Sequence, residues 1–327
     1  MGSYIVRRLL IMIPTVALIS VLTFIVVELP PGDYASRYAE GLELRGENID
    51  PEHIQAIREL YHLDDPTVTR FIRWIGGIFT GNLGFSIEFG MPVAEMFKNR
   101  FPITILLSIA SMLFTWAVAF PIGLYSAVRQ YSFGDYFWSV VGFFGLAVPN
   151  FLLALVLMYF SAKHLGGAIG GLHSREFEDA AWSLPKVIDM AKNLLIPVVV
   201  IGTASTAGLI RILRANLLDE LKRPYVELAR AKGLTERRLI MKYPLRIAIN
   251  PFLSGAGNIL PGLISGAVIT EIVLDLPAMG PVFLRAVRAE DMQLVSTYMV
   301  LIAILTVIGT LISDLLLAVA DPRIRYD

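Results

Sequence analysis

The stretch LLIMIPTVALISVLTFIVV, residues Leu9–Val27, decides the fold class of this chain because it contains 19 consecutive residues without a charge. A helix of about 20 predominantly apolar residues crosses the hydrocarbon core of a bilayer. The run is longer than the apolar region of a secretion signal, and Glu28, Pro30 and Pro31 follow it instead of a small-residue cleavage site. We therefore predict a retained first membrane helix over residues 8–29.

The overall composition also indicates a membrane protein. The chain has 327 residues, a mean hydropathy of +0.64 and 17% charged residues, whereas soluble domains carry about 25%. The formal net charge is zero, so no global field favours nucleic acid as a partner. The absence of cysteine excludes disulfides, thiolate catalysis and cysteine-based zinc sites.

Five further segments are long and apolar enough to span a membrane. With the first helix, the predicted spans are residues 8–29, 103–128, 135–161, 194–214, 252–274 and 295–319. Ten basic residues against four acidic ones lie between Arg211 and Arg246, in the connection after the fourth span. Because basic loops stay in the cytoplasm, we predict a multi-pass protein of the bacterial plasma (inner) membrane with both termini cytoplasmic. Arg285 and Arg288 are the exception to this charge distribution.

These assignments divide the chain into three parts. Residues 1–29 form the cytoplasmic N-terminus and first transmembrane helix, residues 30–101 form an external (periplasmic) helical insertion, and residues 102–327 form a five-helix transmembrane core. The predicted fold class is therefore an all-α integral membrane protein with six transmembrane helices. The connection over residues 162–193 contains GGAIGG and is expected to be a flexible loop.

Two helices are expected in the external insertion. Asp50 can cap a helix that opens with Pro51 and runs to about His62. A second helix is expected to start near Pro66. It carries an apolar stripe that needs a cover, either the membrane surface or a partner; the stripe consists of Val68, Phe71, Ile72, Ile75 and Phe79.

Catalytic and metal-binding motifs are absent from the sequence. There is no Walker-type phosphate loop, no His-Glu-x-x-His helix and no Gly-x-Ser-x-Gly elbow. The four histidines are scattered and are predicted to be solvated surface residues; they are His53, His62, His164 and His173. We therefore expect no metal site and no catalytic residue, and an intramembrane enzyme is disfavoured.

Three acidic residues lie in or near the predicted spans, where burial of a charge costs roughly 3 kcal/mol or more. They are Glu28, Glu271 and Asp314. All lie near span ends, which favours snorkelling or pairing with arginine over a proton relay. Gly262 and Gly266 form a GxxxG pair that favours close helix packing on the fifth span.

The stretch YVELARAKGL, residues 225–234, lies in the basic connection at about 219–250. Pro224 can start a short helix, with Glu227 in its first turn, and Gly233 can end it. A second helix is expected with Thr235 as its N-cap and Pro244 at its end. The small side chains of this segment permit close docking of another protein. The alternative is a basic loop held at anionic lipid headgroups, and the residues alone do not decide between the two.

This segment resembles the coupling loop in permease subunits of binding-protein-dependent ABC importers, whose motif runs Glu-Ala-Ala, three residues, Gly, nine residues, Ile-x-Leu-Pro. The positions that match in spacing are Glu227, Ala229, Gly233 and Leu245. The positions that depart from the motif are Leu228 for Ala, Tyr243 for Ile and Arg246 for Pro.

Other stretches resemble the oligopeptide/dipeptide/nickel branch of that family and cover most of the chain in order. They are LDDPTVTRFIRWI, GNLGFS with MPVAEMFKNRFPIT, ARAKGL and the ending DPRIRY. LPAMG at Leu276–Gly280 stands where the branch usually has Pro-Gly-x-Gly, and Asn82 stands where Asp is common.

The resemblance implies a type I importer-like permease. Its expected partners are a second homologous permease subunit, in a homo- or heterodimer, two cytoplasmic ATPase subunits that bind ATP and magnesium, an extracytoplasmic substrate-binding protein, and membrane lipid. This chain would hold no cofactor itself. The residues expected to couple to the ATPase subunit are Glu227, Leu228, Ala229, Arg230, Ala231, Lys232, Gly233, Leu234 and Leu245.

The substrate and the residues that line its path are not assigned by the sequence. The resembling branch handles peptides, nickel and some oligosaccharides; we rank peptides first and oligosaccharides second. The alternative function is a stand-alone proton-coupled secondary transporter, in which Asp314 or Glu271 would be indispensable.

Overall fold

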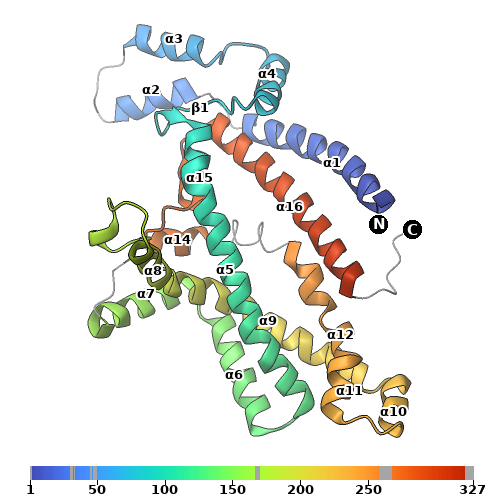
Figure 1. The fold of residues 1–327 in the computed structure, drawn as a ribbon. Helices are drawn as coiled ribbons and strands as arrows, with labels where there is room; N and C mark the ends of the chain where they lie inside the picture. The colour runs from blue at the N-terminus through green and yellow to red at the C-terminus, as the bar shows by residue number, and fades with distance from the viewer. Residues whose placement is uncertain are drawn as a thin grey trace. The chain divides into compact units, whose positions relative to one another are not determined.

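The fold is almost entirely helical (Figure 1). The computed structural model describes residues 2–29, 34–44, 50–165, 170–257 and 267–320, with the single residues 32 and 46. The chain divides into two compact units, which are described separately. Unit 1 comprises Met1–Ile5, Ile103–Pro277 and Thr306–Asp327, and unit 2 comprises Val6–Pro102 and Ala278–Leu305.

The elements follow one another along the chain with short connections. They are α1 (Gly2–Glu28), α2 (Tyr34–Leu44), α3 (Pro51–Leu60), α4 (Thr67–Thr80), β1 (Phe85–Ser86), β2 (Met91–Pro92), α5 (Val93–Val128), α6 (Phe133–Ala147), α7 (Asn150–Phe160), the π-helical turn η1 (Ser161–Leu165), the 3-10 turn η2 (Arg175–Phe177), α8 (Leu184–Asn193), α9 (Leu195–Leu221), α10 (Pro224–Ala231), α11 (Glu236–Lys242), α12 (Pro244–Ala248), α14 (Val268–Val273), α15 (Met279–Arg288) and α16 (Met292–Ala320). Residues 250–257 are also helical.

Among the described residues, four helices are long and apolar enough to cross a membrane, namely Tyr4–Glu28, Val93–Val128, Leu195–Leu221 and Met292–Ala320. They coincide with the first, second, fourth and sixth predicted spans. The fifth predicted span, 252–274, includes residues outside the described ranges, and so does its Gly262–Gly266 pair. The connection over 162–193 is not simply a loop, because its second half contains α8.

The span predicted over 135–161 consists of two helices joined at a sharp bend. α6 ends at Ala147 and α7 begins at Asn150, and the two axes are bent by 103°. The physical reason is Pro149, which lacks a backbone donor and forces the residue before it out of the helical region. Val148 accordingly has φ −83° and ψ 124°. The bent pair is either a broken span or a re-entrant hairpin.

The two helices predicted between α1 and α5 are confirmed in unit 2. Asp50 caps α3 by accepting a hydrogen bond from the amide of Glu52, and Pro51 is its first residue. α4 packs against the end of α1 through a cluster centred on Phe24, Trp74 and Val300. The Phe24 and Trp74 rings are stacked with centroids 5.7 Å apart.

The start of α16 is anchored by a buried carboxylate in unit 2. Asp291 is fully buried and accepts hydrogen bonds from the Ser86 hydroxyl at 2.5 Å and from the amides of Glu88 and Leu294. The sheet formed by β1 and β2 is thereby tied to the first turn of α16. Burial raises the pKa of Asp291, and its hydrogen bonds oppose that effect.

In unit 1, the helix over residues 250–257 meets α16 at a glycine pair. A Cβ atom built on Gly309 would lie 2.5 Å from the carbonyl oxygen of Gly257. The amide of Gly257 donates to the Ser313 hydroxyl at 2.6 Å. The close approach therefore depends on Gly257 and Gly309.

We expect Gly309→Val to destabilise unit 1 by about 1–3 kcal/mol, because the added methyl groups force the two backbones apart. The measurement is thermal unfolding of the purified chain in detergent. Gly255→Val is the matched control, since a Cβ on Gly255 meets nothing within 4 Å. Equal melting temperatures for both variants would contradict the close-packing account.

Candidate coupling site

The segment from α10 to α12 follows the end of α9 and forms a compact group of short helices (Figure 1). Pro224 is the first residue of α10, where its missing amide costs nothing, and Arg223 before it is extended. Glu227 lies in the first turn, where a negative charge suits the helix dipole. The predicted start of this helix is therefore confirmed.

The turn after α10 is a Schellman motif. Gly233 has φ +78°, its amide donates to the Arg230 carbonyl at 3.0 Å, and the Leu234 amide donates to the Ala229 carbonyl at 3.4 Å. This pattern satisfies the last carbonyls of the helix and requires a residue that tolerates positive φ. The predicted role of Gly233 as the helix terminator is confirmed.

An ion pair spans the turn between α10 and α11. Arg230 donates from Nε to one oxygen of Glu236 at 2.5 Å and from NH2 to the other at 3.2 Å. This two-point geometry fixes the relative direction of the side chains. The hydrogen bond from Arg230 lowers the pKa of the Glu236 carboxyl. Thr235 precedes α11 at the N-cap position as predicted, but its hydroxyl makes no capping hydrogen bond.

The inner face of α10 is part of the main apolar core of unit 1. Val226 and Ala229 are buried together with Leu213 and Leu217 of α9. The same cluster contains residues of α5, α11, α12 and the helix over 250–257; they are Ala119, Ala127, Leu239, Ile240, Leu245, Ala248 and Phe252. The short helices are therefore packed against two membrane helices and do not project freely.

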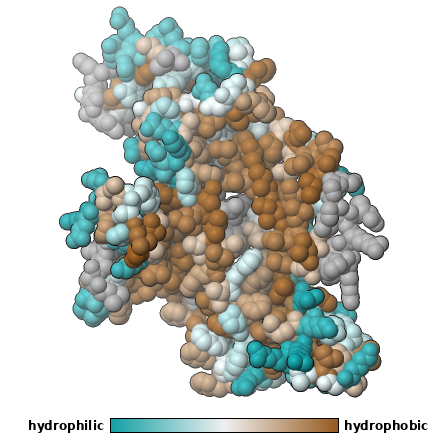
Figure 2. Space-filling view, in the orientation of Figure 1, coloured by the Kyte–Doolittle hydropathy of each residue, from teal (hydrophilic) through white to brown (hydrophobic). Residues whose placement is uncertain are grey.

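The outer face of α10 and α11 is charged with isolated apolar side chains. Leu228 is 58% exposed and Met241 is 52% exposed. Basic and acidic side chains surround them, and Figure 2 shows hydrophilic residues over this region. The exposed charged members are Glu227, Arg230, Lys232, Glu236, Arg237, Arg238 and Lys242. This face therefore offers a partner protein single apolar contacts with charged side chains around them.

The nine residues predicted to couple to a partner divide into three groups by exposure. Glu227, Leu228, Arg230, Ala231, Lys232 and Gly233 are exposed, Leu234 is half-buried, and Ala229 and Leu245 are buried. The small side chain of Ala229 thus permits close packing within this chain. Met241 of α11 is exposed on the same face. It was not predicted as a site residue because it is not one of the motif positions.

A second ion pair connects α9 to the start of α6. Arg214, two turns before the end of α9, donates from Nε and NH2 to both oxygens of Asp135 at 2.9 and 2.8 Å. Asp135 is 2% exposed and also accepts from the Tyr131 amide. Removing one partner of a buried pair leaves an uncompensated charge. The pair therefore holds the start of α6 against α9.

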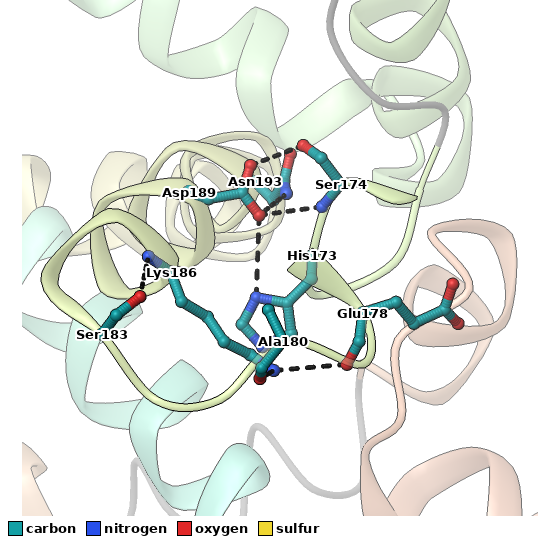
Figure 3. A network of polar contacts seen from close by, with 8 residues as sticks. All are labelled: His173, Ser174, Glu178, Ala180, Ser183, Lys186, Asp189 and Asn193. Atoms are coloured by element: carbon teal, nitrogen blue, oxygen red, sulfur yellow. Dashed lines mark hydrogen bonds and ion pairs between the residues drawn. The ribbon is translucent and has the colours of Figure 1, made fainter. Parts of the chain in front are cut away.

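A polar cluster in the connection before α9 contains a serine, a histidine and an aspartate (Figure 3). Asp189 accepts hydrogen bonds from the Ser174 hydroxyl at 2.5 Å and from the Ser174 amide at 2.8 Å. His173 Nδ1 lies 3.6 Å from Asp189. Because the serine donates to the carboxylate and not to the imidazole, this arrangement does not activate a nucleophile.

The cluster instead fixes the shape of the connection. Burial of Asp189 would raise its pKa, but the hydrogen bonds from Ser174 and the proximity of His173 lower it. Lys186 Nζ donates to the carbonyls of Ala180 and Glu178 at 2.6 and 3.2 Å. The prediction of four solvated histidines is wrong for His173, whose side chain is 12% exposed beside Asp189.

The acidic residues in or near the spans have local partners. Glu28 pairs with Arg70 of α4, as the pairing interpretation predicts, and Asp314 accepts a hydrogen bond from the Tyr4 hydroxyl at 2.8 Å. Glu271 is buried in α14. Within the described ranges, no group of three or more metal-ligating side chains occurs.

A groove of about 380 Å³ lies between α5, α9 and the helix over 250–257. Its lining is apolar with small and hydroxyl residues interspersed, including Thr115, Ser205 and Gly208. Two buried polar atoms of lining residues, Ser111 Oγ and Trp116 Nε1, have no hydrogen-bond partner among the residues that the structure describes. Such atoms are costly unless something pairs with them. No pattern along the chain predicts this groove, because its lining comes from three distant segments.

Comparison with known proteins identifies the family of this fold. Residues 119–326 match the family described as the binding-protein-dependent transport system inner membrane component, and residues 1–108 match the N-terminal model of the same systems. The chain belongs to this permease family. It is therefore a transport subunit and a multi-pass protein of the inner membrane, as the resemblance implied.

Relatives align over essentially their whole length. The oligopeptide transport system permease protein AppB of Bacillus subtilis is 35% identical over 332 residues, covering 100% of both chains. The dipeptide transport system permease protein DppB of Escherichia coli K12 is 31% identical, covering 100% of this chain and 99% of that protein. A probable peptide ABC transporter permease, y4tP of Sinorhizobium fredii, is also 31% identical over the full length of both.

We expect the link between α10 and α11 to depend on pH through Glu236. Because the pKa of Glu236 is lowered in the fold, the link is fully present above the ordinary value near 4.5 and is lost as pH falls through the lowered value. Hydrogen exchange of the α11 amides measures the effect. Glu236→Gln should give faster exchange at pH 7 and remove the acid-induced increase. An unchanged pH profile in this variant would show that the ion pair does not restrain α11.

Proposed function

We propose that this chain is one of two homologous permease subunits in an ATP-driven ABC importer for peptides. Two separate cytoplasmic ATPase subunits bind ATP and magnesium, and an extracytoplasmic binding protein delivers the peptide. The full-length relatives named for oligopeptide, dipeptide and di/tripeptide transport support peptides over oligosaccharides or nickel. The permease contributes no catalytic group.

We further propose six spans with both termini in the cytoplasm and residues 30–101 outside. The ten basic residues between Arg211 and Arg246 support this orientation, because they place α10 to α12 on the cytoplasmic side. The same side holds the proposed contact with an ATPase subunit. The bent pair of α6 and α7 counts as one broken span in this topology.

The observation that carries the coupling proposal is the two-sided character of α10. Its outer side exposes Leu228 among charges, and its inner side buries Val226 and Ala229 against α9 and α5. A partner that binds the outer side of α10 therefore moves α5 and α9 with it. Closure of the ATPase pair on ATP displaces α10, and packed side chains transmit the displacement because a close-packed core does not absorb it.

The solute path includes the groove between α5, α9 and residues 250–257 in this proposal. A peptide offers backbone donors and acceptors, and the exposed Ser205 hydroxyl in the lining is a group that can pair with them. The described lining of the groove contains no charged side chain. A neutral lining suits a peptide that must be released again, because it offers no strong ion pair.

We expect Leu228→Asp to weaken docking of the ATPase subunit, because it places a charge in the centre of the contact. A central apolar anchor contributes about 2 kcal/mol, equivalent to about a thirty-fold weaker Kd. The measurement is co-purification of ATPase subunits with the tagged chain, followed by titration of the recovered subunits.

Lys222→Asp is the control for this experiment. It adds the same side chain at an exposed position one residue beyond α9 and before the start of α10. Both variants should retain the thermal stability of the wild type because neither side chain packs inward. The coupling proposal is wrong if ATPase subunits bind Leu228→Asp as tightly as they bind the wild type.

We expect Gly208→Trp to block peptide uptake while leaving ATPase binding intact. A Cβ on Gly208 meets nothing within 4 Å, so the large ring can enter the groove without displacing a helix. The control is Leu195→Trp, at an exposed position at the start of the same helix. Peptide uptake into proteoliposomes that contain the complete transporter measures the effect. If Gly208→Trp takes up peptide as fast as the wild type, the groove is not part of the solute path.

A further inference from the structure

α4 has an apolar face that its own chain covers only in part. On a helix that turns about 100° per residue, its apolar side chains form one continuous arc of about 160°. Phe71, Trp74 and Ile78 form one half of this arc and pack into the cluster with Phe24. The other half is exposed: Val68 at 69%, Ile72 at 64% and Phe79 at 86%. Exposure of three large apolar side chains in a row requires a cover.

The position of α4 along α1 is fixed within unit 2. The Phe24 and Phe71 rings meet edge to face at 5.3 Å, and Arg70 pairs with Glu28 at the last residue of α1. Phe24 lies one turn, about 6 Å, before Glu28. α4 is therefore held at the level of the final turn of a membrane-spanning helix.

That level is the boundary between hydrocarbon and headgroups. The apolar helix Tyr4–Glu28 has 25 residues, which gives about 38 Å against a hydrocarbon core of about 30 Å. Its end at Glu28 consequently extends into the headgroup region, while Phe24 lies near the acyl chains. A helix pinned beside these two residues lies at the depth that amphipathic interfacial helices occupy.

The side faces of α4 match three different surroundings. Arg70, Trp74 and Phe71 face the chain itself, and Thr69, Arg73 and Thr80 lie on an exposed polar side. The exposed apolar face, formed by Val68, Ile72 and Phe79, lies between these two sides. Apolar side chains of α1, among them Leu22 and Val26, are also exposed.

We propose that α4 is an interfacial helix whose exposed apolar face, formed by Val68, Ile72 and Phe79, is inserted into the lipid leaflet at the Glu28 end of α1. Its polar side faces the headgroups and water. The helix thereby acts as an anchor that holds the segment between α1 and α5 at the membrane surface. This inference rests on the membrane location of α1 and does not depend on the solute or on coupling to an ATPase.

The test uses nitroxide labels on single cysteines, since the natural chain has no cysteine to replace. Labels at Ile72 and Phe79 are compared with labels at Thr69 and Thr80 on the polar side of the same helix. The full chain, with the subunits that co-purify, is reconstituted into vesicles of phosphatidylethanolamine and phosphatidylglycerol. Collisions with oxygen, which concentrates in lipid, and with a water-soluble nickel chelate report the surroundings of each label.

The proposal expects the ratio of oxygen to nickel accessibility to be several-fold higher at Ile72 and Phe79 than at Thr69 and Thr80. Equal nickel accessibility at all four positions would overturn it, because the apolar face would then be in water. Shielding of Ile72 and Phe79 from both reagents would also overturn it, because a protein would then cover the face. Added binding protein would identify that cover if shielding appeared only in its presence.

Discussion

Burial of Val226 and Ala229 in the core that α10 shares with α9 and α5 is the constraint on which the proposed coupling element depends. An isolated helix of eight residues is not stable in water, because helix nucleation costs more than so few hydrogen bonds return. α10 exists because its inner face is part of a core shared with α5 and α9. The Schellman turn at Gly233 and the Arg230–Glu236 pair then fix the direction of α11. Everything that the outer face can do requires this attachment.

The sequence predicts those features that depend on local chemistry. Hydropathy located four membrane helices, Asp50 and Pro51 marked the start of α3, and Gly233 marked the end of α10. These features are predictable because one residue type has a decisive conformational or solvation preference.

Features set by distant contacts could not be predicted in the same way. The sharp bend at Pro149 depends on how α7 packs against α9, since a proline alone permits either a kink or a break. The inward direction of Ala229 was not readable, because alanine suits both a core and a docking surface. The Asp135–Arg214 pair joins residues 79 positions apart, and no pattern along the chain connects them. The groove next to Ser111 could not be predicted either, because its lining comes from segments far apart along the chain.

The turn at Gly233 also has a kinetic consequence for a protein that works in cycles. The last carbonyls of α10 already accept hydrogen bonds, and α10 and α11 are already packed against the core. The proposed docking face is therefore preorganised before any partner binds. Association of a preorganised face costs little conformational entropy. A segment that folds on binding loses conformational entropy each time it binds. Under the proposed function, the permease therefore releases and regains its ATPase partner repeatedly without refolding the element between them.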